Sequence, residues 1–322
     1  MPTALFPRLL GDVGGTNARF AWQSRVGAPP SHIANLLCQD HDSLLAAIRH
    51  YLHQHGLEAP QACAIGIANP VTGDWVQMTN HHWSFSIQAL HAQLGVQRLQ
   101  LINDFSAIAL SLPELPAQDL HLIGPADCAA APNQPMAVLG AGTGLGVSCL
   151  LPTTGQAITG EGGHCTLGAC TSDEAELLRL LAQRFGHVSA ERVLSGPGLV
   201  NLYQACATRY GLMAQPLAPA DVVHRALTGA NPLCLEALDH FCAFLGNFAG
   251  NMALTYGARG GVYLAGGIAP RIIDTLRQSS FRARFEEKGR LKPYLSPIPT
   301  WVIASTHSPA FLGLSQLLDQ PG

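Results

Sequence analysis

The sequence predicts a globular α/β protein of two domains, and three observations lead to this fold class. The chain has 322 residues, which is about twice a typical domain length of roughly 150 residues. Segments with the apolar pattern of strands alternate with segments of helical periodicity, as in α/β folds. A pattern of strand, glycine-rich turn and strand occurs twice, about 130 residues apart. This recurrence suggests a duplicated fold.

The first half is predicted to alternate strands and helices. An apolar run ending at Leu10 and another at 18–23 flank the glycine-rich segment 11–17, which predicts a β-hairpin. Residues 42–55 have helical spacing of apolar side chains that stops at Gly56. The other predicted elements are a strand at 62–68, a helix at 86–94 capped by Ser86, and a strand at 98–102 that leads into a helix.

A stretch rich in proline and alanine, 112–135, interrupts this alternation and predicts a domain boundary near its start. We expect a small α/β domain of residues 1–112, completed by a C-terminal helix at about 306–322, and a large α/β domain of residues 113–305. The large domain begins with a strand, a glycine-rich turn at 140–146 and a second strand. Its further predicted elements are helices at 172–185, 198–210 and 233–256, a strand at 261–265, and a helix opened by Pro270.

Composition excludes several classes of protein. Apolar residues make up 48% of the chain and charged residues 12%, unlike the composition of disordered chains. The net charge of −3 lacks the basic excess that nucleic acid binding usually needs. The first ten residues show no secretory signal, and no run of about 18 apolar residues occurs. We therefore expect a cytoplasmic protein with no nucleic acid or membrane partner.

Lysine and cysteine usage excludes two kinds of site. The only lysines are Lys288 and Lys292, neither of which lies in a glycine-rich run, so the P-loop motif is absent. The nine cysteines are an odd number without a C-x-x-C pair, which favours neither a disulfide framework nor a paired-cysteine zinc site. Reduced and mostly buried thiols are expected.

Both glycine-rich turns suit phosphate binding, because glycine has no Cβ to keep backbone N–H groups away from a phosphate. The first turn adds the Asp12 carboxylate, which can reach a magnesium ion directly or through water, and the Thr16 hydroxyl. The alternative to phosphate binding is that Gly14 and Gly15 only supply the positive φ angles of a tight hairpin. The second turn lacks the G-x-G-x-x-G register and leads into a strand, so it is not a dinucleotide motif.

Asn103 and Asp104 follow the strand at 98–102, and strand ends in open α/β sheets face the ligand crevice. Asp104 is therefore the candidate for acid–base work. The alternative is that this pair only caps the following helix, since both residue types are favoured there.

Glu161 and His164 belong to a segment with three glycines in five residues. This composition argues against a helical metal-ligand pair and favours a loop that presents polar groups to a polyol. Glu191 could present its carboxylate to a ligand, or it could equally be a stabilising carboxylate in the first turn of a helix beginning at Ser189.

Six motifs, taken together, resemble bacterial ATP-dependent glucokinases, and they occur in that family's order over nearly the whole chain. Six motifs in order are far more specific than any one of them. They are GDVGGTNAR at 11–19, INDF at 102–105, GAGTGLG at 140–146, GEGGH at 160–164, HVSAERVLSG at 187–196 and LAGGI at 264–268.

The resemblance implies a duplicated actin-like, ribonuclease H-like ATPase fold whose two domains close over sugar and nucleotide in a central cleft. It implies phosphoryl transfer from ATP to the 6-hydroxyl of glucose, with Asp104 as the base that accepts the hydroxyl proton. Asp104 also binds the sugar in this interpretation, together with Asn103, Glu161, His164 and Glu191.

The resemblance further assigns the ATP phosphates and Mg²⁺ to the two turns, with Asp12 at the metal, and it implies a homodimer. The implied ATP-binding positions are Gly11, Asp12, Gly14, Gly15, Thr16 and Asn17, then Gly142, Thr143 and Gly144, and finally Gly266 and Gly267 near the adenosine.

One departure from related sugar kinases and repressors concerns zinc. Many of them have C-x-C-G-x-x-G-C after the sugar-binding histidine, whereas residues 165–170 here read CTLGAC. We expect no structural zinc. Two other functions stay open: a kinase for another hexose or with polyphosphate or ADP as donor, and a sugar-sensing regulator. The regulator is disfavoured because only ten residues precede Gly11, too few for a DNA-binding helix-turn-helix.

Overall fold

The computed structural model describes residues 5–79 and 81–320. The described chain forms two compact units. The first unit contains the chain up to Leu115, residues 155–159 and the chain from Ser305 onward; the second contains residues 116–154 and 160–304.

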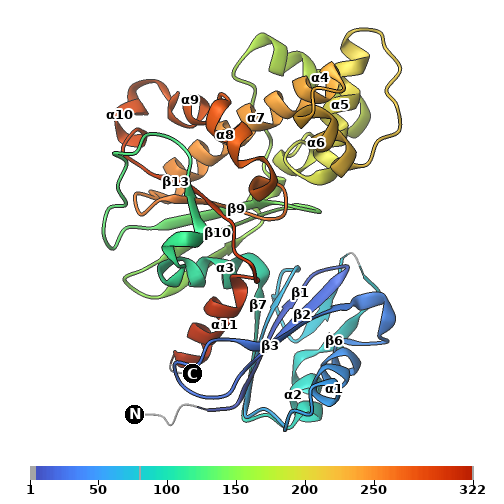
Figure 1. Ribbon diagram of the computed structural model, residues 1–322, viewed down its shortest axis with the longest axis vertical. Helices are drawn as coiled ribbons and strands as arrows, with labels where there is room; N and C mark the ends of the chain where they lie inside the picture. Colours follow the sequence, from blue (N-terminus) through green and yellow to red (C-terminus); the bar gives the residue numbers. More distant parts are fainter. Residues whose placement is uncertain (1–4, 80, 321–322) are drawn as a thin grey trace. The chain divides into compact units, whose positions relative to one another are not determined.

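A five-stranded sheet of order β3-β2-β1-β4-β7 forms the first unit (Figure 1). Its strands are β1 (Arg8–Val13), β2 (Asn17–Gln23), β3 (Ser31–Leu37), β4 (Ala62–Ile67) and β7 (Arg98–Asn103). β1, β4 and β7 are parallel, and the register aligns Val13 with Ile67 and Ile67 with Asn103. The carboxyl ends of these three strands therefore lie at one edge of the sheet. A separate small hairpin joins β5 (Trp75–Gln77) and β6 (Ser84–Ser86).

Two pairs of helices cover the two faces of this sheet. They are α1 (Leu44–Gln54) with α2 (Ile87–Leu94), and α3 (Asp104–Ser111) with α11 (Ala310–Asp319). Leu9 packs in the cluster on the α1 side and Leu10 in the cluster on the α11 side, because neighbouring side chains of a strand point to opposite faces. α11 packs closely on α3, where Gly313 lies against the carbonyl oxygen of Ala107.

The second unit repeats the hairpin and parallel strands of the first. Its strands β10-β9-β12-β13-β8 are neighbours in that order, with β9, β12 and β13 parallel and β10 and β8 antiparallel at the two sides. The bounds are β8 (Leu120–Leu122), β9 (Met136–Ala141), β10 (Leu145–Leu151), β12 (Val262–Ala265) and β13 (Thr300–Ile303). β2-β1-β4-β7 and β10-β9-β12-β13 thus share order and direction, so the predicted duplication is confirmed. β11 (Gln156–Gly160) belongs mostly to the first unit.

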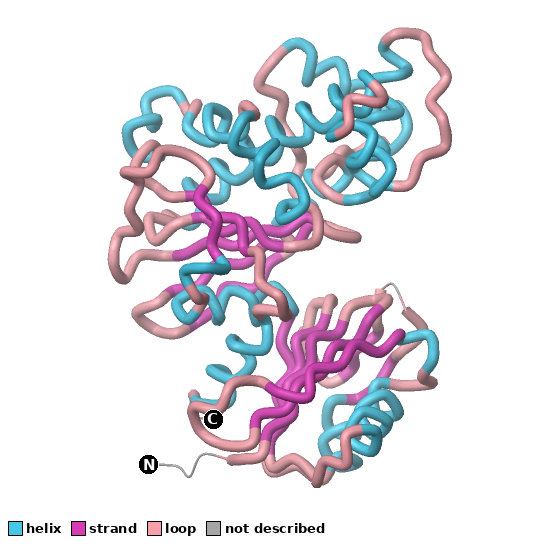
Figure 2. Tube along the Cα trace, viewed as in Figure 1, coloured by secondary structure: helices cyan, strands magenta, loops and turns pink. Residues whose placement is uncertain are grey.

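A layer of helices covers the sheet of the second unit (Figure 2). The long, largely buried α7 packs against α5, α6 and α9, and its Gly246 and Gly250 let the carbonyls of Phe281 and Phe285 approach its backbone. The helices are α4 (Ser172–Phe185), α5 (Gly196–Arg209), α6 (Pro219–Leu227), α7 (Pro232–Tyr256), α8 (Ile273–Gln278), α9 (Phe281–Glu286) and α10 (Lys292–Leu295).

The strands and helices predicted above are all present, with small changes at their ends. The helix predicted from residue 198 begins at Gly196, because the Ser195 side chain caps it by accepting from the Gly198 N–H at 3.0 Å. Pro270 opens a 3₁₀ turn, Ala269–Ile272, before α8 begins. Among the described helices, none combines the length and apolar character needed to cross a bilayer.

Candidate active site

The first glycine-rich turn joins β1 to β2 and is closed by its own hairpin. The Gly14 N–H donates to the Asn17 carbonyl at 2.9 Å, and the Cys38 N–H donates to the Thr16 carbonyl at 2.9 Å. Asp12 lies opposite Arg19 in the β1–β2 register, and Arg19 Nη1 is 3.1 Å from Asp12 Oδ2. This ion pair orients the Asp12 carboxylate beside the turn.

Asn103 and Asp104 begin α3 at the carboxyl edge of the same sheet. Asn103 is the N-cap, and its Oδ1 accepts from the N–H groups of Phe105 at 2.9 Å and Ser106 at 3.2 Å. Asn103 thus fills the N-cap position that the sequence left open, and Asp104 Oδ1 also accepts from the Phe105 N–H at 3.0 Å. Asp104 is the first helical residue, where the helix dipole favours the ionised carboxylate.

Gly66 is a residue of this edge that sequence reasoning missed. A Cβ at this position would lie 3.2 Å from the Ala107 Cβ and 3.4 Å from the Asp104 Cα. The missing side chain therefore lets the start of α3 approach β4. An isolated glycine within a strand pattern is the signal that would have pointed to this close approach.

The second glycine-rich turn joins β9 to β10 and is held by segments distant in sequence. The Gly142 N–H donates to the Gly144 carbonyl at 2.8 Å, and the Gly142 carbonyl accepts from the Gly196 N–H at 2.8 Å. The Leu145 N–H donates to Glu191 Oε2 at 2.9 Å. Thr143 lies between the two turn glycines.

Glu161 and His164 lie beside the start of β10. Residues Gly162–His164 form a 3₁₀ turn rather than the predicted loop, and His164 Nε2 is 3.9 Å from Glu161 Oε2, with both side chains more than half exposed. Gly163 packs against the Leu145 carbonyl. The structure thus brings this segment, the second turn and Glu191 together around Leu145.

Glu191 belongs to a single 3₁₀ turn, Ala190–Arg192, with Ser189 as its N-cap, rather than to a helix beginning at Ser189. The Ala190 N–H donates to the Cys165 carbonyl at 2.9 Å, which links this turn to the residue after His164. Ser189 Oγ accepts from the Arg192 N–H at 3.4 Å. The Glu191 carboxylate is therefore not used to cap its own turn. It accepts a hydrogen bond from the Leu145 N–H instead.

Gly266 and Gly267 follow β12 beside the second turn. Gly266 has φ of +82° and packs against the Ala141 carbonyl, and the Ile268 N–H donates to the same carbonyl at 3.3 Å. This glycine conformation keeps the chain close to the end of β9.

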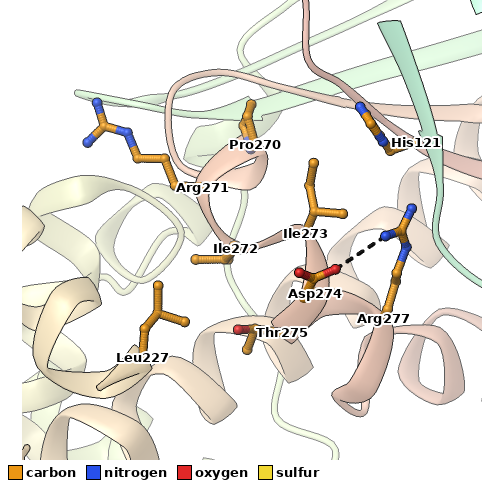
Figure 3. Close-up of a pocket in the computed structure, with 9 residues that line it drawn as sticks. All are labelled: His121, Leu227, Pro270, Arg271, Ile272, Ile273, Asp274, Thr275 and Arg277. Atoms are coloured by element: carbon orange, nitrogen blue, oxygen red, sulfur yellow. Dashed lines mark hydrogen bonds and ion pairs between the residues drawn. The ribbon is translucent and has the colours of Figure 1, made fainter. Parts of the chain in front are cut away.

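A cavity of about 380 Å³ opens three residues after Gly267 (Figure 3). It lies around the Pro270 turn and the start of α8, with Leu227 from the end of α6 and His121 from β8. Arg277 pairs with Asp274 at 3.3 Å at its rim. Sequence reasoning missed the cavity, because its walls come from segments far apart in the chain.

Two repeats of one sheet pattern, each with a glycine-rich turn next to carboxylates, define a protein of the actin-like ATPase fold. The glucokinase family model matches residues 9–321. The glucokinase of Aromatoleum aromaticum is 50% identical over 326 residues, covering 99% of this chain and 97% of the relative. The chain belongs to the glucokinase family, and it is an ATP-dependent hexose kinase.

Solved structures agree with this fold. The crystal structure of a glucokinase from an Antarctic psychrotroph has a TM-score of 0.87 and 35% identity, covering 97% of this chain and 98% of that chain. The crystal structure of the Balamuthia mandrillaris glucokinase in complex with glucose has a TM-score of 0.82 and 22% identity, covering 99% of this chain and 96% of that chain.

Proposed function

We propose that this enzyme transfers the γ-phosphoryl group of ATP to the 6-hydroxyl of glucose and releases glucose 6-phosphate and ADP. The observation that carries the proposal is the Asp104 carboxylate at the start of α3, in a chain of the glucokinase family. Glucose is also the ligand of the Balamuthia glucokinase. The two compact units are the small and large domains in this proposal.

Asp104 is the general base. It accepts the proton of the 6-hydroxyl while that oxygen forms a bond to the γ-phosphorus, and the bond from the γ-phosphorus to the bridging oxygen breaks as ADP leaves. Asp104 is the first residue of α3, a position where the helix dipole stabilises negative charge. Such a base typically contributes a rate factor of roughly 10²–10⁴.

The other sugar hydroxyls are bound by Asn103, Glu161, His164 and Glu191. Asn103 Oδ1 caps α3, so its Nδ2 group is the one directed to the sugar. Glu161 and Glu191 supply charged acceptors, which make stronger hydrogen bonds to hydroxyls than neutral acceptors do. Together these groups hold the substrate, while phosphoryl transfer itself depends on positioning and charge stabilisation.

The two turns bind the phosphates through backbone N–H groups and through the hydroxyls of Thr16 and Thr143. A Cβ at Gly142 would meet nothing within 4 Å, so a phosphate can approach this backbone. Asp12 suits Mg²⁺, which prefers carboxylate oxygens and keeps several waters and substrate phosphates as ligands. When bound, the ion neutralises charge on the phosphates; no zinc is part of this proposal.

The adenosine is proposed to lie beside Gly266 and Gly267 and to extend into the cavity of Figure 3. Leu227 and Ile273 offer apolar surface to the base, and Arg271 offers a cation. Purine sites commonly combine apolar walls with a few polar groups in this way.

The test is an assay of ADP release with glucose, mannose and glucosamine as acceptors, and of glucose 6-phosphate formation with ATP, ADP or polyphosphate as donors. We expect the highest kcat/KM with glucose and ATP. Faster turnover of another hexose, or of another donor, would contradict the proposal. Light scattering tests the homodimer that we also propose.

A further inference from the structure

The peptide groups of Leu145 join the second glycine-rich turn to the sugar-binding segments. Leu145 is the first residue of β10 and follows the turn directly. Its N–H donates to Glu191 Oε2 at 2.9 Å, and its carbonyl oxygen would be only 2.1 Å from a Cβ on Gly163. Both segments assigned to the sugar in the second unit therefore contact this one residue.

Gly144 leaves room for the Glu191 carboxylate. A Cβ on Gly144 would lie 2.5 Å from Glu191 Oε2, closer than non-bonded atoms pack, and 3.3 Å from Glu191 Cδ, a tight contact. Gly144 does not have a left-handed φ, so a left-handed backbone is not the reason for glycine here. The carboxylate, rather than the backbone, is the reason that this position needs glycine.

The segment that carries Glu191 is fixed to the turn at a second point. Ser195 Oγ donates to the Glu191 carbonyl at 2.8 Å, and the Gly196 N–H donates to the Gly142 carbonyl at 2.8 Å. With its main chain held in this way, Glu191 can respond to a side chain at position 144 only by moving its carboxylate.

We propose that Gly144 is a positioning residue for the sugar, in addition to its place in the ATP-binding turn. It lets the Glu191 carboxylate rest on the Leu145 N–H, in the orientation that accepts the sugar hydroxyl. The second turn thus serves both substrates, and a side chain added at position 144 alters glucose affinity even when no nucleotide is present. This inference rests on the proposed function, because it takes Glu191 as a glucose ligand.

The test compares Gly144→Ala with Gly142→Ala by calorimetric titration of glucose without nucleotide. Both variants add one methyl group to the same turn, but only the methyl at 144 meets the carboxylate. We expect Gly144→Ala to raise the glucose Kd roughly tenfold or more, the effect of weakening a hydrogen bond to a charged group. Gly142→Ala should keep the wild-type Kd. Equal Kd values for the two variants would overturn the inference.

A double-mutant cycle shows whether the effect passes through Glu191. In a Glu191→Ala background, adding Gly144→Ala should change the glucose Kd less than about twofold, because the methyl group then has no side chain at 191 to displace. The same tenfold loss in both backgrounds would mean that Gly144 acts independently and would overturn the inference.

The wild-type protein offers a measurement that does not depend on any variant folding. Glucose that holds Glu191 in place should slow hydrogen exchange of the Leu145 amide, and an unchanged exchange rate at saturating glucose would contradict the inference. Gly144→Ala is expected to fold, because the displaced atoms are the end of a flexible side chain. If the wild-type chain neither binds nor phosphorylates glucose, the proposed function itself has failed.

Discussion

The two glycine-rich turns occupy equivalent positions in the two sheets, yet they are stabilised differently. The first is closed by residues of its own hairpin and by Cys38, and its carboxylate Asp12 pairs with Arg19 on the adjacent strand. The second is held by Gly196 and by the Glu191 carboxylate, about 50 residues further along the chain.

This difference shows how a duplicated element acquires two roles. The first turn, held by its own hairpin and by Cys38, can bind Mg²⁺ and phosphate independently of the sugar. In the second turn, a side chain at position 144 would meet the Glu191 carboxylate and so change the sugar site. We therefore expect variants near the first turn to affect chemistry and nucleotide, and variants near the second to affect glucose affinity.

The largest effect is expected from Asp104→Asn, at the edge that carries the first turn. The amide keeps the shape of the side chain but cannot accept the proton, so kcat should fall by roughly 10²–10⁴ while glucose still binds. Steady-state kinetics with calorimetric glucose titration checks this. Asp173→Asn makes the same change in the first turn of α4 and should leave kcat near wild type. If Asp104→Asn keeps more than about a tenth of kcat, Asp104 is a sugar ligand or a helix-start residue only.

Glu161→Gln and Glu191→Gln are the matching changes in the second unit. Each should raise the KM for glucose more than it lowers kcat, because these groups contact hydroxyls in the ground state and the transition state alike. A charged acceptor contributes about 1.5–3 kcal/mol. Initial rates over a range of glucose concentrations decide the matter, and an unchanged KM in both variants would remove these residues from the site.

Asp12→Asn tests the independence of the first turn. Loss of a carboxylate near Mg²⁺ should lower kcat/KM for MgATP by about 10–100-fold, the typical cost of losing an outer ligand of a metal. Glucose affinity without nucleotide should not change, in contrast to Gly144→Ala. A weaker glucose affinity in Asp12→Asn would show that the two turns do not differ as described. Arg19→Gln keeps the Asp12 carboxylate but removes the ion pair that orients it. This variant therefore separates the effect of the Asp12 charge from the effect of its orientation.

The smallest effect concerns the acid stability of the second unit. Burial in α7 lowers the pKa of His240 below its ordinary 6.5, against the opposing influence of Glu236. As pH falls through 6.5, the unfolded chain takes up this proton before the folded one, so His240 reduces stability until its folded pKa is passed. The change is at most about 1.4 kcal/mol per pH unit.

Thermal unfolding between pH 7.5 and 5 should therefore show a shallower fall in Tm for His240→Gln than for wild type. His81 in the first unit also has a lowered pKa, through desolvation and the neighbouring His82. For that reason, part of the fall in Tm should remain in His240→Gln. Identical pH profiles for the two proteins would mean that His240 does not contribute.

The sequence by itself determined the elements and their duplication. Strand and helix patterns depend on side chains a few residues apart, and the glycine-rich turns follow from the conformational freedom of glycine. The same local pattern placed Asp104 at the start of a helix at a strand end, where the structure has it. These features need no knowledge of distant parts of the chain.

Only the tertiary structure decided which residues meet. It assigned capping of α3 to Asn103, set Gly66 against α3, and placed the Glu191 carboxylate on Leu145. It also assembled the cavity of Figure 3 from segments as far apart as His121 and Arg277. Such contacts depend on strand register and helix packing over long sequence separations, and no local periodicity records them.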